Sequence, residues 1–358
     1  MFYYKQYRRD ALNKRIDYLD GLRGLAILLV LGYHAFSRWT ELLPYGNHFD
    51  TPFFQSGWLG VQLFFLISGF VIFMTLDKCK SQKEFLYKRW MRLFPAMFIA
   101  TILIFTTSSF FYERPAGVPE LLSILPGLTF IEPEWWSKLL KTEIGEMEGA
   151  FWSLYVEFKF YVIASILFFY IGRDRLIYSL LFLFLCAVGL GFLVHHIDSS
   201  VVQYANRISE MLSLRYFGWF AAGSSFYLFY QTQNKYWFYI GIVIASISAV
   251  FVSNVFSLSS IIGALLVVVL FSVSLISHHF QFILKSKILL FFGYVSYPLY
   301  LIHENAMISM MIKTGNVFPD LPVYIYPIVP IIVLTTISYI IVKFGEPYLK
   351  SLINIKFN

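Results

Sequence analysis

Arg23 and His34 are ionisable residues inside an apolar stretch of the sequence, which makes them the first candidates for chemistry. They are eleven residues apart, and at about 100° per residue both fall on one face of a helix, with a rise of about 16 Å between them. A guanidinium group stays cationic and holds anions, whereas an imidazole titrates near neutral pH and can act as a general base. We therefore expect one helix to present a fixed cation near the cytoplasmic surface and a titratable base further along.

Glu157 and His303 lie in two further apolar stretches, where an ionisable group costs about 2.5–3.5 kcal/mol at the membrane centre and is a functional candidate. The helical rise along each stretch places both at nearly the depth of His34. Each of these side chains alone could form a purely structural ion pair. The common depth of His34, Glu157 and His303 on three helices favours an acid–base site. Polar residues expected on the same helix faces are Ser153 and Tyr161 beside Glu157, and Ser296 and Tyr300 beside His303.

Arg89 and Arg92 lie three residues apart in a basic loop between two apolar runs and are expected on one face of a short helix. Arginine forks bind phosphate groups in a bidentate manner, so this pair could hold a phosphorylated cofactor from the cytoplasm. The alternative is that these charges set the membrane topology and contact anionic lipids. Composition alone favours the alternative.

The composition excludes most other classes of protein. The chain has 358 residues, of which 58% are hydrophobic, 20% aromatic and only 14% charged, whereas soluble domains carry about 25% charged residues. A soluble enzyme, a fibrous protein, a disordered chain and a disulfide-rich secreted domain are therefore excluded. The net charge of +7 fits the positive-inside rule of membrane proteins better than nucleic-acid binding, and no nucleic-acid partner is expected. Cys79 and Cys186 lie in unlike surroundings and predict no disulfide.

Apolar runs of spanning length predict an all-α, polytopic membrane protein with about ten transmembrane helices. Nineteen Lys and Arg residues fall in the segments on the same side of the membrane as the two chain ends, and six fall in the loops on the opposite side. By the positive-inside rule this predicts cytoplasmic termini. The expected parts are a cytoplasmic N-terminal segment (1–17), a membrane domain (18–344) and a cytoplasmic tail (345–358), with 112–149 as an external loop. The predicted spans are 18–37, 58–76, 94–111, 150–171, 176–194, 213–230, 237–253, 261–277, 288–311 and 324–344.

Six stretches, taken in order, resemble the bacterial membrane-bound acyltransferase family 3, whose members acylate cell-surface and exported glycans. The resemblance covers nearly the whole chain. Each motif alone is weak evidence for the family, whereas the six motifs in this order are strong evidence for it. The stretches are RIDYLDGLRGLAILLVLGYH (15–34), GWLGVQLFFLISGFVI (57–72), KRWMRLFP (88–95), FWSLYVEFKFY (151–161), SYPLYLIH (296–303) and FGEPY (344–348).

This resemblance implies an O-acyltransferase of the bacterial cytoplasmic (inner) membrane that uses a cytoplasmic acyl-CoA donor, with acetyl-CoA as the common case. The acceptor would be a hydroxyl of a surface or lipid-linked glycan, in contact with membrane lipid. Many relatives append an extracytoplasmic hydrolase-like domain. Because the chain ends about 14 residues after its last predicted span, a separate extracytoplasmic transferase is the expected partner. No metal is expected.

Residue roles carry over from the resemblance at matching positions only. Arg23 and His34 become the essential pair, with Arg23 also on the donor side, and Arg89 and Arg92 become donor-binding groups. Acyl transfer needs a base for the hydroxyl proton, so His34 is expected to be that base or, as the second choice, a transient acyl carrier. Glu157 and His303 are expected to orient the acceptor sugar or His34 and complete the catalytic set.

The sequence also departs from the family pattern. Phe158-Lys159 follows Glu157 where a second acidic or amide residue is common, Ala96-Met97 replaces the aromatic residue often found after the loop proline, and Glu304 follows His303. We assign no role to Lys159, Arg215, Glu304 or Glu346 from the sequence.

Two functions of other classes remain open. A proton-coupled transporter or a flippase for a lipid-linked sugar could use buried His and Glu residues as a relay. Such proteins often show inverted repeats and paired broken helices, and the sequence contains neither. A structural membrane subunit is the third possibility, although it would not need two layers of ionisable groups.

Overall fold

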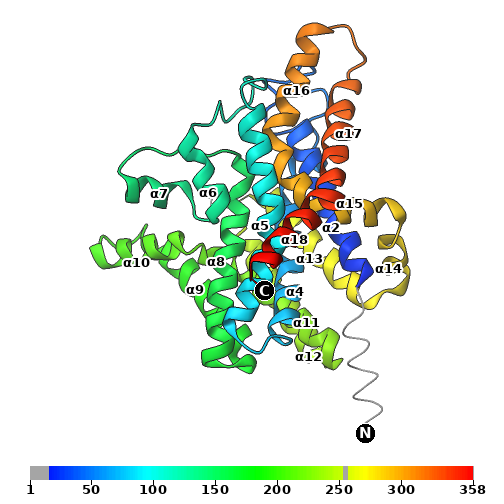
Figure 1. The fold of residues 1–358 in the computed structure, drawn as a ribbon. Helices are drawn as coiled ribbons and strands as arrows, with labels where there is room; N and C mark the ends of the chain where they lie inside the picture. Colours follow the sequence, from blue (N-terminus) through cyan, green and yellow to red (C-terminus); the bar gives the residue numbers. More distant parts are fainter. Residues whose placement is uncertain (1–15, 253–256, 358) are drawn as a thin grey trace.

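The computed structural model describes residues 16–252 and 257–357, and all regular structure in this part of the chain is helical (Figure 1). The predicted all-α class is therefore confirmed. The predicted N-terminal segment lies almost entirely outside the described residues. So do five bases that support the predicted orientation, namely Lys5, Arg8, Arg9, Lys14 and Arg15.

Long helices follow the predicted apolar runs. They are α2 (Asp17–Phe36), α4 (Gly60–Leu76), α5 (Gln82–Thr107), α8 (Trp152–Ile166), α9 (Leu176–Leu193), α11 (Phe217–Thr232), α12 (Lys235–Val250), α13 (Leu258–Ile276), α15 (Lys287–Ile302) and α17 (Ile325–Ile340).

Shorter helices connect or extend the long ones. They are α3 (Pro52–Gln55), α6 (Ile124–Thr129), α7 (Pro133–Leu140), α10 (Ser200–Met211), α14 (His278–Leu284), α16 (Glu304–Val317) and α18 (Glu346–Phe357). Two π-helical turns, Leu167–Ile171 and Ile341–Gly345, extend α8 and α17, and 3₁₀ turns occupy Gly57–Leu59, Leu121–Ser123, Gly149–Phe151, Arg173–Arg175 and Leu214–Tyr216.

Seven helical stretches within the described residues are long and apolar enough to cross a membrane, and an eighth follows if α14 and α15, bent by 64°, count as one span. The chain is therefore a multi-pass membrane protein. Helices α11 and α12 have 16 residues each, which is short for a span of about 20 residues. Ten spans with both ends in the cytoplasm stay a prediction.

The helix expected around Arg89 and Arg92 is present, but the expectation that it is short and lies in a loop before the third span was wrong. Residues Gln82–Thr107 form one helix, α5, which continues through Pro95. Spanning helices tolerate an internal proline because neighbouring groups satisfy the freed backbone positions. The predicted span 288–311 also differs, because α15 passes through Pro298 and ends at Ile302, and α16 begins only after His303.

Helices α2 and α15 touch backbone to backbone. A Cβ atom on Gly24 would lie 2.0 Å from the carbonyl oxygen of Leu289, and one on Gly293 would lie 2.0 Å from that of Asp20. Small residues allow this close approach between membrane helices. The contact fixes the position of Arg23 and His34 relative to the residues of α15.

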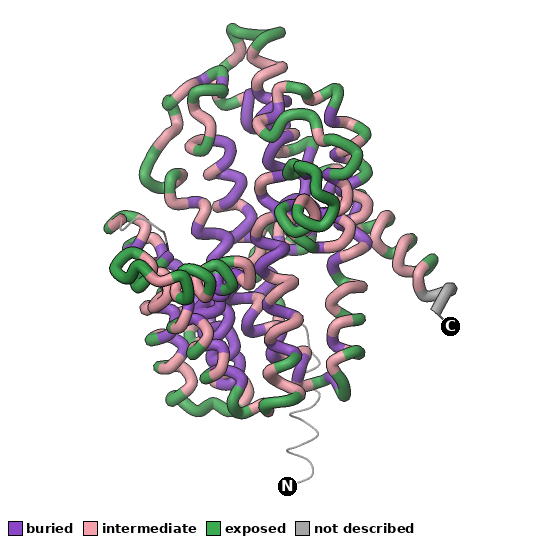
Figure 2. Tube along the Cα trace, turned by 90° about the vertical axis from the view of Figure 1, so that its left-hand side faces the viewer, coloured by how far each residue is buried: buried purple, intermediate pink, exposed green. Residues whose placement is uncertain are grey.

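The buried core runs along the middle of the bundle, and exposed residues gather in the loops and on α10 (Figure 2). Helix α4 packs against both α2 and α11, and α2 also packs against α15. Helices α6, α7 and α10 lie on one side of the bundle and α14 lies on the opposite side (Figure 1). The segment 112–149 holds short helices and no span, as predicted.

Candidate active site

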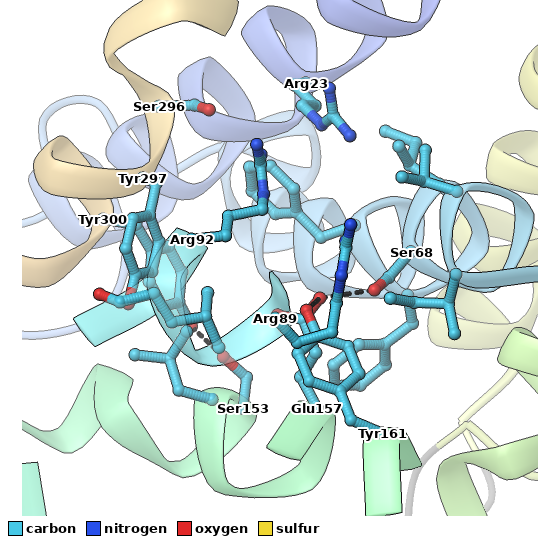
Figure 3. Close-up of a pocket in the computed structure, with 17 residues that line it drawn as sticks. Arg23, Ser68, Arg89, Arg92, Ser153, Glu157, Tyr161, Ser296, Tyr297 and Tyr300 are labelled. Atoms are coloured by element: carbon cyan, nitrogen blue, oxygen red, sulfur yellow. Dashed lines mark hydrogen bonds between the residues drawn. The ribbon is translucent and has the colours of Figure 1, made fainter. Parts of the chain in front are cut away.

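A narrow cavity of about 90 Å³ lies inside the bundle, between α2, α4, α5, α8 and α15. Five apolar segments therefore contribute to one site, and each brings polar side chains to it. The polar residues that line it are Arg23, Ser68, Arg89, Arg92, Ser153, Glu157, Tyr161, Ser296, Tyr297 and Tyr300 (Figure 3).

The charge of this cavity suits an anion. Arg23, Arg89 and Arg92 face Glu157, so three guanidinium groups are set against one carboxylate (Figure 3). The shared face predicted for Arg89 and Arg92 is confirmed, although the face belongs to the long helix α5. Buried cations need a partner, which an anionic ligand can supply.

Two of the arginines are partly satisfied within the protein. The Arg23 guanidinium donates to the Asp20 carboxylate at 2.5 Å. The Nη2 atom of Arg89 donates to the Thr75 hydroxyl at 3.0 Å, whereas its buried Nε atom has no hydrogen-bond partner in the described structure. Arg89 therefore keeps a donor available for a ligand.

Glu157 is held in place by two hydroxyl groups. The Ser68 hydroxyl donates to its carboxylate, and the Tyr161 phenol donates to the same oxygen at 2.5 Å (Figure 3). Ser153 and Tyr161 line the cavity together with Glu157, as their spacing predicted. Sequence reasoning missed Ser68, although a serine inside an otherwise apolar helix was a usable signal.

A wider cavity of about 500 Å³ adjoins the narrow one, and Arg23, Arg92, Ser296 and Tyr297 line both. The two cavities therefore share a wall, and the wider one lies near the starts of α2 and α18. The remaining charged residues of the wider cavity are Asp20, Lys78, Glu346 and Lys350. Glu346 accepts a hydrogen bond of 2.7 Å from Lys350, so the predicted tail forms part of this wall.

His34 and His303 lie outside both cavities and pack against each other. Their ring centroids are 4.9 Å apart with planes inclined by 72°, and both residues are buried. The Nδ1 atom of His303 lies 2.9 Å from the Tyr300 carbonyl oxygen. The common depth predicted for three groups thus brings the two histidines together, while Glu157 belongs to the cavity.

Tyr300 connects the histidine pair with the cavity. It lines the narrow cavity, and its hydroxyl lies 2.8 Å from the Ser153 hydroxyl (Figure 3). On its other side the Tyr300 ring lies 5.5 Å, centroid to centroid, from the His303 ring. The histidines therefore lie directly behind the wall that Tyr300 forms.

Two ionisable residues without a predicted role have structural partners away from the cavity. Lys159 donates to Glu132 at 2.7 Å and to Ser213 at 2.9 Å, which ties α8 to the segment 112–149 and to the turn before α11. Arg215 donates to the carbonyl oxygen of Phe251 at 3.0 Å.

The fold defines a multi-pass membrane protein with an arginine-lined cavity inside its helix bundle, and sequence comparison supplies its family. The chain belongs to the family described as Acyltransferase domain, acyltransferase family 3, which matches residues 16–343.

Among its relatives, the peptidoglycan O-acetyltransferase OatA of Listeria monocytogenes is 28% identical over 167 residues, 42% of this chain and 24% of that protein. The O-acetyltransferase OatA of Staphylococcus aureus is 26% identical over 203 residues, 52% of this chain and 31% of that protein. The match thus spans about a quarter to a third of these relatives. No solved structure matches the chain.

Proposed function

We propose that this chain is an O-acyltransferase of the bacterial cytoplasmic membrane. It moves an acyl group, with acetyl as the first candidate, from a cytoplasmic acyl-CoA to a hydroxyl of a surface or exported glycan. The carrying observation is that Arg23, Arg89 and Arg92 converge on one cavity that adjoins a wider charged one. Family membership and the O-acetyltransferase names of the relatives support the same class of reaction.

The two cavities suit the two parts of an acyl-CoA. The nucleotide and its phosphates need room and cations, which the wider cavity offers through Arg23, Arg92, Lys78 and Lys350. The long, mostly uncharged arm needs a narrow channel, and the smaller cavity leads from Arg92 to Tyr300. In this arrangement Arg23 and Arg92 contact the donor at the junction, and Arg89 contacts it further along.

The chemistry takes place at the far end of this channel. His34 accepts the proton of the glycan hydroxyl, the oxygen attacks the thioester carbonyl, and the CoA thiolate leaves and takes up a proton. A transient acyl group on His34 is the second route. Glu157 and His303 position reactants or His34, and Tyr300 lies where the donor channel meets the histidines.

Equilibrium binding and transfer assays with radiolabelled acetyl-CoA test this proposal in the purified protein. The double variant Arg89→Gln, Arg92→Gln should lose donor binding by tenfold or more, since each lost charge-assisted hydrogen bond is worth about 1.5–3 kcal/mol. Arg175→Gln removes an exposed cation in the turn before α9 and is the matched control. Equal donor binding in the double variant and the control would overturn the donor site.

His34→Ala separates binding from chemistry. We expect this variant to bind the donor as the wild type does and to transfer no acyl group to a glycan acceptor. Transfer at the wild-type rate would show that His34 is neither the base nor an acyl carrier.

A further inference from the structure

Glu304 is a buried acid that faces His34. It begins α16, directly after the helix break at His303, and its side chain is 8% exposed. Its Oε1 atom lies 4.0 Å from the Nδ1 atom of His34, and that nitrogen has no hydrogen-bond partner in the described structure. A carboxylate and an unpartnered imidazole nitrogen thus face each other in a buried place.

The Glu304 carboxylate is fixed from its other side. Its Oε2 atom accepts a hydrogen bond from the Ala150 amide at the start of the α8 segment. Gly149 leaves the room that this requires, because a Cβ atom there would lie 2.9 Å from Oε1 of Glu304. The carboxylate therefore cannot swing freely away from His34.

A second buried network holds the backbone that carries Glu304. Glu148 pairs with Arg114 at 2.9 Å and accepts hydrogen bonds from the Asn305 amide and side chain. The Asn305 side-chain oxygen in turn accepts from the Ala116 amide at 2.8 Å. The break between α15 and α16 is thus clamped to the external loop, which gives Glu304 a defined position.

We propose that Glu304 is the positioning residue for His34, a role that rests on the proposed function of His34 as the base. Its carboxylate orients the imidazole with the proton on Nδ1, so that Nε2 is left to accept the proton of the glycan hydroxyl. The carboxylate also stabilises the imidazolium formed in this step. A buried acid that orients a catalytic histidine is a recurrent solution in acyl transfer, and its loss costs up to about 10⁴-fold in rate.

The charges around the pair determine how it titrates. Burial, and then the neighbouring Glu148, raise the pKa of Glu304 to about 8. The other groups that act on the pair are His303 on α15, Arg38 after α2 and Glu146 in the external loop. At neutral pH the Glu304 carboxyl group therefore holds a proton, and it becomes the carboxylate that orients His34 when that proton is lost.

Steady-state kinetics of Glu304→Gln test the proposal, with Glu148→Gln as the matched control. The amide keeps the size of Glu304 and an acceptor for the Ala150 amide but removes the charge. We expect Glu304→Gln to lower kcat about 10²–10⁴-fold with an unchanged KM for acetyl-CoA. The rise of activity with pH should move to lower pH, because the Glu304 carboxyl group, which must lose its proton in the wild type, is absent.

Glu148→Gln removes an equally buried carboxyl group that pairs with Arg114 instead of His34. It should lower the melting temperature and move the pH profile less than Glu304→Gln does, because Glu148 is only the second cause, after burial, of the raised pKa of Glu304. Glu304→Asp keeps the charge and should recover part of kcat. Equal pH profiles in the two Gln variants, or a kcat of Glu304→Gln within twofold of the wild type, would overturn the proposal.

Nitrogen-15 NMR of the histidine side chains provides a readout that needs no activity. With the His34 signals assigned by their loss in His34→Ala, the wild type above pH 8, where Glu304 is a carboxylate, should carry the proton mainly on Nδ1, and Glu304→Gln should shift it toward Nε2. An unchanged tautomer would contradict the pairing. If the tautomer shifts but no donor supports transfer, the pairing stands and the proposed function fails. If His34→Ala is inactive and Glu304→Gln is fully active, only the pairing fails.

Discussion

Replacing Gly24 by alanine tests whether the backbone contact between α2 and α15 builds the site. The new Cβ atom would lie 2.0 Å from the Leu289 carbonyl oxygen, whereas ordinary contact begins at 3.4 Å. The difference of the two values, about 1.4 Å, is the distance by which the two helices must separate. Since Arg23 lines the cavity from α2 and Tyr300 lines it from α15, this separation acts on both walls of the site.

The expected cost follows from overpacking and from misplacement. An overpacked core loses about 1–3 kcal/mol of stability. A misplacement of about 1 Å in a catalytic geometry can cost about 10²-fold in rate. We therefore expect Gly24→Ala to insert into the membrane, to melt at a lower temperature, and to transfer acyl groups about 100-fold more slowly.

Gly189→Ala is the matched control for this experiment. Gly189 lies in α9, and a Cβ atom there would meet no atom within 4 Å. Thermal unfolding in detergent and acetyl transfer from labelled acetyl-CoA should both remain at wild-type values in this variant. If Gly24→Ala matches Gly189→Ala in both assays, close packing of α2 on α15 is not what positions the site.

Three further predictions concern stability and topology. Lys159→Ala breaks the 2.7 Å ion pair with Glu132, in which the two side chains are 16% and 25% exposed, and should lower the melting temperature. Lys138→Ala breaks a 2.7 Å ion pair with Glu134, in which the side chains are 59% and 68% exposed, and should change the melting temperature much less. An equal loss of stability in both variants would refute the role of burial. Burial raises the pKa of Glu148 from 4.5 to about 7. The folded state therefore binds the extra proton and loses stability as pH rises through this window, so the melting temperature should fall more steeply with pH in the wild type than in Glu148→Gln, and parallel curves would contradict this. A reporter fused after residue 358 should be active only on the cytoplasmic side, and activity only outside would reverse the topology.

Helix faces could be predicted from the sequence because the helical repeat fixes them locally. Ser153, Glu157 and Tyr161 share one face of α8 and all line the cavity, as their spacing of four residues required. Arg89 and Arg92 also line it together. The extent of this helix was not predicted, because the sequence analysis expects a short helix in a basic loop before the span, whereas α5 continues through Pro95 into the span.

Contacts between helices could not be predicted, because rise along a helix gives depth and says nothing of lateral position. His34, Glu157 and His303 have similar expected depths, yet only the two histidines meet. The contact between Glu304 and His34 depends on the helix break after His303, which turns the acid toward α2. Neither the break nor the facing residue of α2 follows from the local pattern of the sequence.

The ester content of the surface glycan, measured by mass spectrometry in the host cell, tests the proposed transfer most directly. Cells that produce the wild-type protein should carry acyl esters, expected to be acetyl, on this glycan. Cells that lack the protein, or that produce His34→Ala at equal membrane abundance, should not carry them. Unchanged ester content in either kind of cell would contradict acyl transfer by this protein through His34.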